Sequence, residues 1–253
     1  MDATAIAQRA LPLLDLTDLA DDATENGARH LCDRAETPFG PVAAVCLWPR
    51  FVSLAKDVLR DSEARVATVV NFPAGGDDTG AVIAETEQAV ADGADEIDLV
   101  IPWRALLEGR PGFAETQISR VRRVLPRGVL LKTILETGSL GSAANIALAA
   151  DVALAAGSDF LKTSTGKVGI GATPEAAEIL LTKISGAGRP VGFKASGGIR
   201  SLADAATYLT LADRLLGEHW VSPDTFRFGA SGLLDVLLAT LSGAAAPAAA
   251  KGY

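Results

Sequence analysis

The chain has 253 residues, of which 49% are hydrophobic and 21% are charged, a composition typical of a packed globular protein and not of a disordered one. Its formal net charge of -8 argues against a nucleic-acid-binding surface. Two cysteines, Cys32 and Cys46, are too few for a disulfide framework, and no CxxC pattern or Cys/His cluster suggests zinc.

The first 30 residues contain an early acidic residue and lack a basic segment followed by an apolar core, so they do not resemble a secretory signal. We interpret them as a helix that caps the floor of the domain. Nothing in the sequence approaches 18 uncharged apolar residues, so we expect no membrane partner and a cytoplasmic location.

Beyond these residues, short β-branched runs alternate with longer alanine-rich runs of helical periodicity. Thr173 and Pro174 give the clearest helix start, because threonine caps helices and proline favours their first position. The pattern predicts strands at 42–48, 65–72, 95–101, 129–135, 159–164, 190–195, 213–216 and 226–229, of which 213–216 is weak. It predicts helices at 50–60, 78–92, 113–125, 142–156, 174–185, 201–211 and 231–242.

Eight predicted strands that alternate with helices over this length indicate an α/β fold of the TIM (β/α)8 barrel type. The near-continuous apolar strands favour a parallel sheet covered by helices. An open doubly wound sheet would place a GxGxxG turn after the first strand, and none is present there. We predict one barrel domain over 1–242, followed by a flexible tail over 243–253.

Four ionisable side chains lie inside otherwise apolar predicted strands. They are Asp98 in EIDLVIP, Lys132 in VLLKTILE, Lys162 in DFLKTST and Lys194 in VGFKASGG. An unpaired charge in an apolar interior is costly or shifts its pKa until it is neutral. Each group alone is compatible with a solvated strand end or a structural ion pair. Together they indicate side chains that point into the barrel near its carboxyl-terminal mouth, where TIM-barrel active sites lie.

Two lysines on neighbouring strands suit imine chemistry. Lys162 and Lys194 fall on the fifth and sixth predicted strands. A second lysine nearby and a low-dielectric pocket both lower the pKa of an amine, which is otherwise protonated at neutral pH. The free amine attacks a carbonyl, and the resulting iminium accepts electrons when a C–C bond is cleaved or formed. We expect Asp98 to move the protons.

Two glycine-rich turns indicate a phosphate site. Residues 197–200 (GGIR) and 228–232 (FGASG) each follow a predicted strand and open a helix. Glycines let backbone N–H groups approach an anion, and a helix N-terminus favours negative charge. Lys167, in the turn at 165–167, adds a cation beside them.

Segments spread over nearly the whole chain resemble deoxyribose-phosphate aldolase. The most specific are DFLKTSTGKV (159–168) and VGFKASGGIR (191–200), and EIDLVIPWRAL (96–106) adds to them. LLDLTDLADDAT (13–24) and the terminal Tyr253 look closest to the longer form typified by enterobacteria. The resemblance implies a cofactor-free class I aldolase that reversibly cleaves 2-deoxy-D-ribose 5-phosphate to glyceraldehyde 3-phosphate and acetaldehyde. It also makes a homodimer plausible.

The matching motifs imply roles for individual residues. Lys162 corresponds to the Schiff-base nucleophile, Lys194 to the lysine that perturbs its pKa and transfers protons, and Asp98 to the proton relay. Tyr253 matches, by position only, a tail tyrosine that donates a proton to the enamine carbon. The phosphate end of the pocket is matched by Lys167, Gly197, Gly198, Arg200, Gly229 and Ser231, and the substrate channel by Asp15, Thr17, Cys46 and Thr165.

Some positions keep more than one interpretation. Gly232 stands where the family often has a serine, so we expect a weaker phosphate preference. Cys46 also fits a small buried hydrophobic residue. Lys132 and Glu136, on one predicted strand, form either an ion network that orders the reactive lysines or a merely structural pair.

Two other functions stay open at this stage. A Schiff-base aldolase for another phosphorylated sugar would share Lys162 and the phosphate turns. A phosphosugar-binding barrel without lyase activity, such as an isomerase or a regulatory binder, would bind the sugar without forming an imine. No set of His, Asp and Glu residues has metal-ligand spacing, so we expect no metal.

Overall fold

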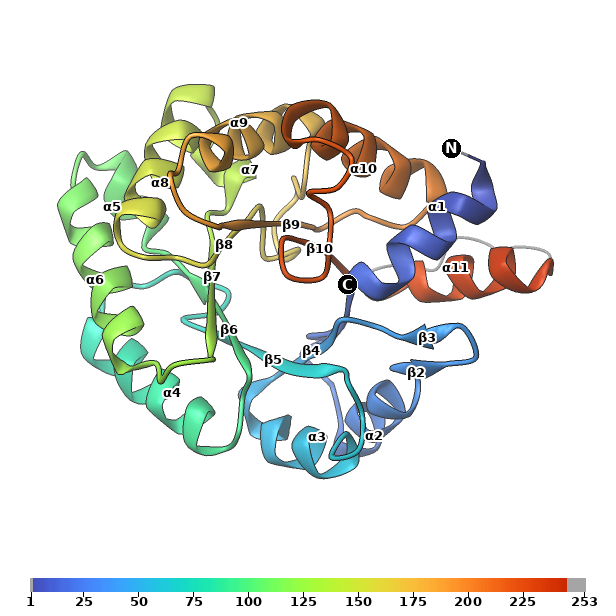
Figure 1. The fold of residues 1–253 in the computed structure, drawn as a ribbon. Coiled ribbons are helices and arrows are strands. Elements are labelled where there is room, and N and C mark those ends of the chain that lie inside the picture. The colour runs from blue at the N-terminus through green and yellow to red at the C-terminus, as the bar shows by residue number, and fades with distance from the viewer. Residues whose placement is uncertain (1, 245–253) are drawn as a thin grey trace.

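The computed structural model describes residues 2–244, and within them eight parallel strands close into a barrel surrounded by helices (Figure 1). The predicted TIM barrel is confirmed. Around the barrel the strands follow the order β1-β10-β9-β8-β7-β6-β5-β4. The barrel strands are β1 (Leu14–Asp18), β4 (Ala44–Leu47), β5 (Arg65–Val70), β6 (Glu96–Val100), β7 (Leu130–Ile134), β8 (Phe160–Lys162), β9 (Gly192–Ser196) and β10 (Phe226–Ala230). A small antiparallel pair, β2 (Glu36–Thr37) and β3 (Gly40–Pro41), lies outside the barrel.

Helices follow most of the strands, and local signals define several of their starts. The Thr173 side chain accepts a hydrogen bond from the Ala176 N–H, and Ser201 with Asp204 forms a capping box. The α-helices are α1 (Ala3–Ala10), α2 (Glu25–Asp33), α3 (Val52–Val58), α4 (Thr79–Ala91), α5 (Trp103–Leu107), α6 (Pro111–Val124), α7 (Thr137–Leu140), α8 (Ala143–Ala155), α9 (Pro174–Ser185), α10 (Leu202–Leu216) and α11 (Leu233–Ser242). Short 3-10 turns occupy Leu11–Leu13 and Pro49–Phe51. None of the helices in the described range is long and apolar enough to cross a membrane.

Two sequence-based predictions of secondary structure are wrong. Residues 14–18 form β1, not part of a capping helix, because β1 pairs with both β10 and β4 and thereby closes the barrel. Residues 213–216 continue α10 instead of forming a strand. Asp213 there binds Arg9 of α1, an ion pair that fixes the first helix against α10. The number of strands is therefore as predicted, but the set of strands is different.

The main apolar core lies between the barrel and the helices, where outward-facing strand residues such as Leu14, Leu16 and Ile97 pack. The alternate residues of the same strands face the barrel axis, because successive side chains of a strand point to opposite faces. Several of these inward residues are charged. The barrel interior is thus polar where the outer core is apolar, and the site is built there.

Candidate active site

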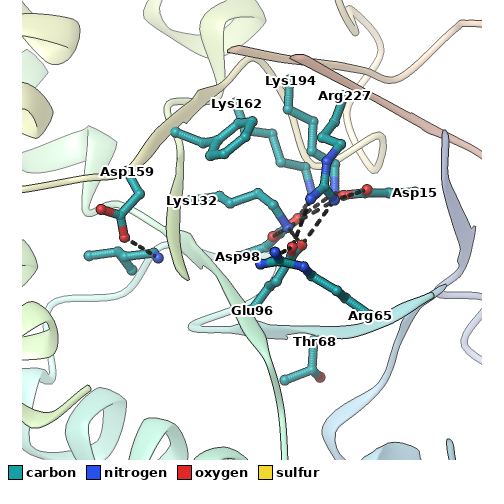
Figure 2. A network of polar contacts seen from close by, with 12 residues as sticks. Asp15, Arg65, Thr68, Glu96, Asp98, Lys132, Asp159, Lys162, Lys194 and Arg227 are labelled. Atoms are coloured by element: carbon teal, nitrogen blue, oxygen red, sulfur yellow. Dashed lines mark hydrogen bonds and ion pairs between the residues drawn. The ribbon is translucent and has the colours of Figure 1, made fainter. Parts of the chain in front are cut away.

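Two lysines and an aspartate from three strands meet inside the barrel (Figure 2). The Lys162 amine lies 2.6 Å from Asp98 Oδ2, and the Lys194 amine lies 2.8 Å from the same oxygen. Asp98 and Lys194 are fully buried, and Lys162 is 2% exposed. The structure therefore brings together the three side chains that the sequence pattern singled out as reactive groups.

Strand register explains this convergence. Lys162 of β8 is in register with Lys194 of β9, so both side chains point to the same face at the same level. Asp98 of β6 is in register with Lys132 of β7, which lies between β6 and β8. The Lys132 amine is 2.9 Å from Asp98 Oδ1, so the Asp98 carboxylate contacts three lysines.

Further carboxylates and an arginine complete the network. Asp15 Oδ2 is 2.5 Å from the Lys194 amine, and Asp15 Oδ1 is 2.6 Å from Arg227 Nη1. Glu96 accepts hydrogen bonds from Lys132 and from Arg227, whose Nη2 lies 2.9 Å from Glu96 Oε1. Asp15 was expected along the substrate channel, whereas Glu96 and Arg227 were not predicted. The rule that selected the lysines, a charge within an apolar strand, would also have selected Arg227 in FRFGA.

The neighbouring charges shift the pKa values of Lys162 and Lys194 in opposite directions. Burial and the positive charge of Lys194 lower the pKa of Lys162, although Asp98 opposes this effect. Burial also disfavours the charged form of Lys194, but Asp15 and Asp98 outweigh it and hold the pKa of Lys194 well above its ordinary value. The three lysines keep the pKa of Asp98 well below the usual range despite its burial. Lys162 is therefore the amine that most readily gives up its proton.

The two glycine-rich turns lie side by side. Residues 197–200 and 229–231 line one small hollow, at the starts of α10 and α11. Gly197 and Gly198 have φ of 84° and 89°, a region that disfavours other residues. A Cβ on Gly229 would lie 3.0 Å from Lys194 Cε, so this hollow borders the lysine cluster. The arrangement suits an anion bound next to a reactive amine.

Sequence comparisons agree with this geometry. Residues 10–235 match the model of the DeoC/LacD family aldolases. The chain belongs to this family. It is 50% identical over 98% of its length to the deoxyribose-phosphate aldolase of Agrobacterium fabrum, of which it covers 96%. The non-lyase alternative is thereby set aside, because the family consists of aldolases.

Solved structures of similar proteins support the same assignment of fold. The apo-form crystal structure of a Toxoplasma gondii ME49 protein assigned as a deoxyribose-phosphate aldolase superposes with a TM-score of 0.88. The identity is 26%, and the match covers 95% of this chain and 98% of that one. The deoxyribose phosphate aldolase of Aeropyrum pernix, described as a tetramer, has a TM-score of 0.75 at 27% identity, over 94% and 92% of the two chains.

Other predicted channel residues of this aldolase lie around the cluster. Thr17 is buried and its hydroxyl donates to the Asp15 carbonyl over 2.8 Å. Cys46 is fully buried and belongs to a small apolar cluster with Leu19, Ala44, Ala67 and Val69. Burial raises the pKa of Cys46, which favours the neutral thiol.

Glu136 and Lys132 do not form the predicted pair. Within the described part of the chain, Lys132 contacts Asp15, Glu96 and Asp98. Glu136 instead follows β7 in a left-handed conformation and accepts a 2.5 Å hydrogen bond from the Thr165 hydroxyl. The sequence interpretation failed because it extended the strand over Glu136, whereas β7 ends at Ile134.

Two predicted residues of the aldolase need separate mention. The Lys167 amine lies 2.8 Å from Asp21, a largely exposed residue that follows β1. Tyr253 and all of the predicted tail beyond residue 244 lie outside the described residues.

Proposed function

We propose that this chain is a deoxyribose-phosphate aldolase that uses Lys162 as its Schiff-base nucleophile. The single observation that carries the proposal is the shared contact of the Lys162 and Lys194 amines with Asp98 Oδ2, inside a chain of this aldolase family. The name of the Agrobacterium fabrum relative supports deoxyribose 5-phosphate as the substrate.

The chemistry begins with the free amine of Lys162, which attacks the C1 aldehyde of the open-chain sugar. The carbinolamine hydroxyl takes up a proton and leaves as water, which gives a protonated imine. The C2–C3 bond then breaks and its electron pair moves toward the iminium, which forms an enamine, while the C3 hydroxyl loses its proton and becomes the aldehyde of glyceraldehyde 3-phosphate. Protonation of the enamine carbon and hydrolysis by water release acetaldehyde and restore the amine.

Asp98 and Lys194 are suited to move the protons of these steps. Asp98 lies within hydrogen-bond distance of both amines, and its lowered pKa keeps it available as an acceptor. Lys194 keeps its positive charge and holds down the pKa of Lys162. The two lysines therefore divide the work: Lys162 is the nucleophile, and Lys194 is charged at rest and exchanges protons during turnover.

The hollow at 197–200 and 229–231 would hold the C5 phosphate. Backbone N–H groups of two glycine-rich turns and two helix N-termini favour an anion there. Thr165 and Lys167 lie on the loop between β8 and α9, and the Thr165 hydroxyl accepts the Lys167 N–H over 3.0 Å. Gly232 at the start of α11 supplies no hydroxyl, which fits a weaker preference for phosphorylated substrates.

The resemblance supplies two finer parts of the proposal, the longer enterobacterial form and a homodimer. The cytoplasmic location is proposed from the sequence, in which no targeting or membrane signal was recognised. Light scattering of the purified protein tests the dimer directly. A mass corresponding to one chain would refute it.

A reductive trap tests the function. Acetaldehyde is added to the protein, borohydride is then added, and the modified peptide is identified by mass spectrometry. We expect an ethyl group on Lys162 and none in Lys162→Met, with Lys183→Met as the control, since Lys183 is a partly exposed lysine of α9. An unmodified wild-type protein would overturn the imine mechanism. Turnover of deoxyribose 5-phosphate compared with other phosphorylated sugars then distinguishes the proposed substrate from the alternative aldolase.

A further inference from the structure

Two residues of the buried network, Glu96 and Arg227, have no role in the mechanism above. They lie at the amino-terminal ends of β6 and β10. Both are at most 1% exposed. Arg227 lies between two carboxylates, with Nη1 2.6 Å from Asp15 Oδ1 and Nη2 2.9 Å from Glu96 Oε1. Glu96 also accepts a hydrogen bond from Lys132. Neither residue contacts Lys162 directly, so any effect on the nucleophile passes through the network.

The formal charges of the buried cluster balance only when Lys162 is neutral. Among the buried groups, the contacting carboxylates are Asp15, Glu96 and Asp98, and the contacting cations other than Lys162 are Lys132, Lys194 and Arg227. Arg65, which is partly exposed to solvent, also lies 3.7 Å from Glu96 and is treated separately below. These three negative and three positive charges cancel. A protonated Lys162 would therefore leave the buried cluster with one unmatched positive charge, which a low-dielectric interior disfavours. A neutral Lys162 leaves the cluster balanced.

Geometry selects Lys162 as the neutral amine. Lys194 contacts two carboxylates, Asp15 and Asp98, and Lys132 contacts Glu96, Asp98 and Asp15. Lys162 contacts only Asp98 among the carboxylates of the described residues, and it shares the contacted oxygen with Lys194. It therefore gains least from being charged.

We propose that Arg227 and Glu96 are positioning residues that set the charge balance of the barrel interior and so keep the amine of Lys162 unprotonated at neutral pH. The inference rests on the proposed function, since it assigns a charge state to the proposed nucleophile. Arg227 offsets the negative charge of Asp15 and part of the negative charge of Glu96. Without that positive charge, Asp15 and Glu96 would draw Lys132 and Lys194 away from Asp98, and Asp98 would favour the protonated form of Lys162.

Other titratable groups lie near Lys162 or near Glu96 and Arg227, and they do not change the charge balance of the buried cluster. Cys46 of β4 is a neutral thiol, since burial raises its pKa. Glu136, after β7, accepts from Thr165 at the mouth of the barrel. Arg65 of β5 lies 3.7 Å from Glu96 Oε1 at the opposite end, is 40% exposed and also faces Asp224. Burial raises the pKa of Glu136, and both Glu136 and Arg65 are unchanged in every variant below, so neither alters the comparison between variants.

The test measures imine formation on Lys162 against pH. Each protein is incubated with acetaldehyde for a fixed short time between about pH 5 and 10, quenched with borohydride and analysed for the ethyl adduct. In the wild type, adduct formation rises with pH as Lys162 loses its proton. Arg227→Met removes one positive charge, so we expect the midpoint to move up by about one pH unit or more, which is tenfold less adduct below the midpoint.

Three companion variants separate charge from structure. Glu96→Gln removes one negative charge and should move the midpoint to lower pH. The double variant Arg227→Met with Glu96→Gln restores the balance and should return the midpoint toward the wild-type value. Arg227→Lys keeps the charge and should keep the midpoint. A purely structural role would lower adduct formation at every pH without moving the midpoint.

The outcomes are distinguishable from failure of the proposed function. If the wild type forms no adduct on Lys162, the imine mechanism itself fails. If the wild type forms the adduct but Arg227→Met leaves the midpoint unchanged, the charge-balance inference fails. Should Arg227→Met not fold, as judged by circular dichroism, Glu96→Gln still decides, because an unchanged or higher midpoint in that variant contradicts the inference.

Discussion

Lys162 and Lys194 share one oxygen atom, Asp98 Oδ2, at distances of 2.6 and 2.8 Å. Two amines held to one carboxylate oxygen cannot both be stabilised fully as cations. Lys194 has a second carboxylate in Asp15, whereas Lys162 does not have such a contact among the described residues. The difference between two chemically identical side chains therefore comes from their neighbours.

Asp98→Asn should damage both chemistry and stability. It removes a proton acceptor, and loss of general acid–base catalysis lowers rates by about 10²–10⁴. It also takes the shared carboxylate from three buried lysines, so we expect about 3–5 kcal/mol less free energy of unfolding. Turnover and urea unfolding measure the two effects. Asp151→Asn, at a half-exposed ion pair with Lys183, is the matched control and should change neither.

Lys194→Met should leave an enzyme whose activity recovers partly at high pH. Without the Lys194 charge, the pKa of Lys162 rises, so the free amine exists only at more alkaline pH. Lys162→Met, by contrast, lacks the nucleophile and should show no turnover at any pH. Rate measurements from neutral to alkaline pH compare the two proteins. A Lys194→Met profile parallel to that of the wild type would argue against the pKa role.

Gly171→Ala should weaken binding of the phosphorylated substrate. A Cβ there would lie 2.3 Å from the carbonyl oxygen of Gly197, so the β8–α9 loop must move away from the glycine-rich turn at 197–200. We expect KM for deoxyribose 5-phosphate to rise about tenfold or more, which corresponds to about 1.4 kcal/mol or more. Adduct formation with acetaldehyde, which has no phosphate, should be nearly unchanged. Gly169→Ala is the control in the same loop, because its Cβ would meet open space. Equal effects of the two substitutions on KM would contradict a specific role of Gly171 in binding the phosphorylated substrate.

The protein should lose stability steeply in acid. Burial alone would raise the pKa of Asp15, but Lys132, Lys194 and Arg227 lower it, and the pKa of Asp98 also lies well below its ordinary value. A carboxylate with a lowered folded-state pKa contributes stability above its unfolded pKa, near about 3.9, and loses it as pH falls toward the folded value. We expect the urea midpoint to fall between about pH 5 and 3, and Asp98→Asn to show a shallower fall. A midpoint independent of pH in this range would contradict the assigned pKa directions.

The sequence indicated the fold and the buried lysines because both follow local rules. Apolar strands alternating with helices predict the barrel, and a lysine in an apolar strand must have a partner. Glu96 escaped notice because it stands at the start of β6, where a charge is ordinary. The strand β1 was missed because LDLTD is short and follows a helix-like segment, and its pairing with β10 joins residues more than 200 positions apart. Such long-range pairings, and the sharing of one carboxylate by three lysines, are set by the closed barrel and leave no local pattern.

The position of β1 between β4 and β10 has a consequence for biosynthesis. Asp15 is made among the first residues, yet its partners Lys194 and Arg227 follow 179 and 212 positions later. A nascent chain therefore carries the first strand unpaired on one side until β10 has left the ribosome. Non-local pairing of this kind folds slowly, and unpaired strand edges are prone to aggregation. Premature termination before β10 would leave the interior lysines without their full set of counter-charges, so an incomplete barrel would lack the charge arrangement that the proposed chemistry requires.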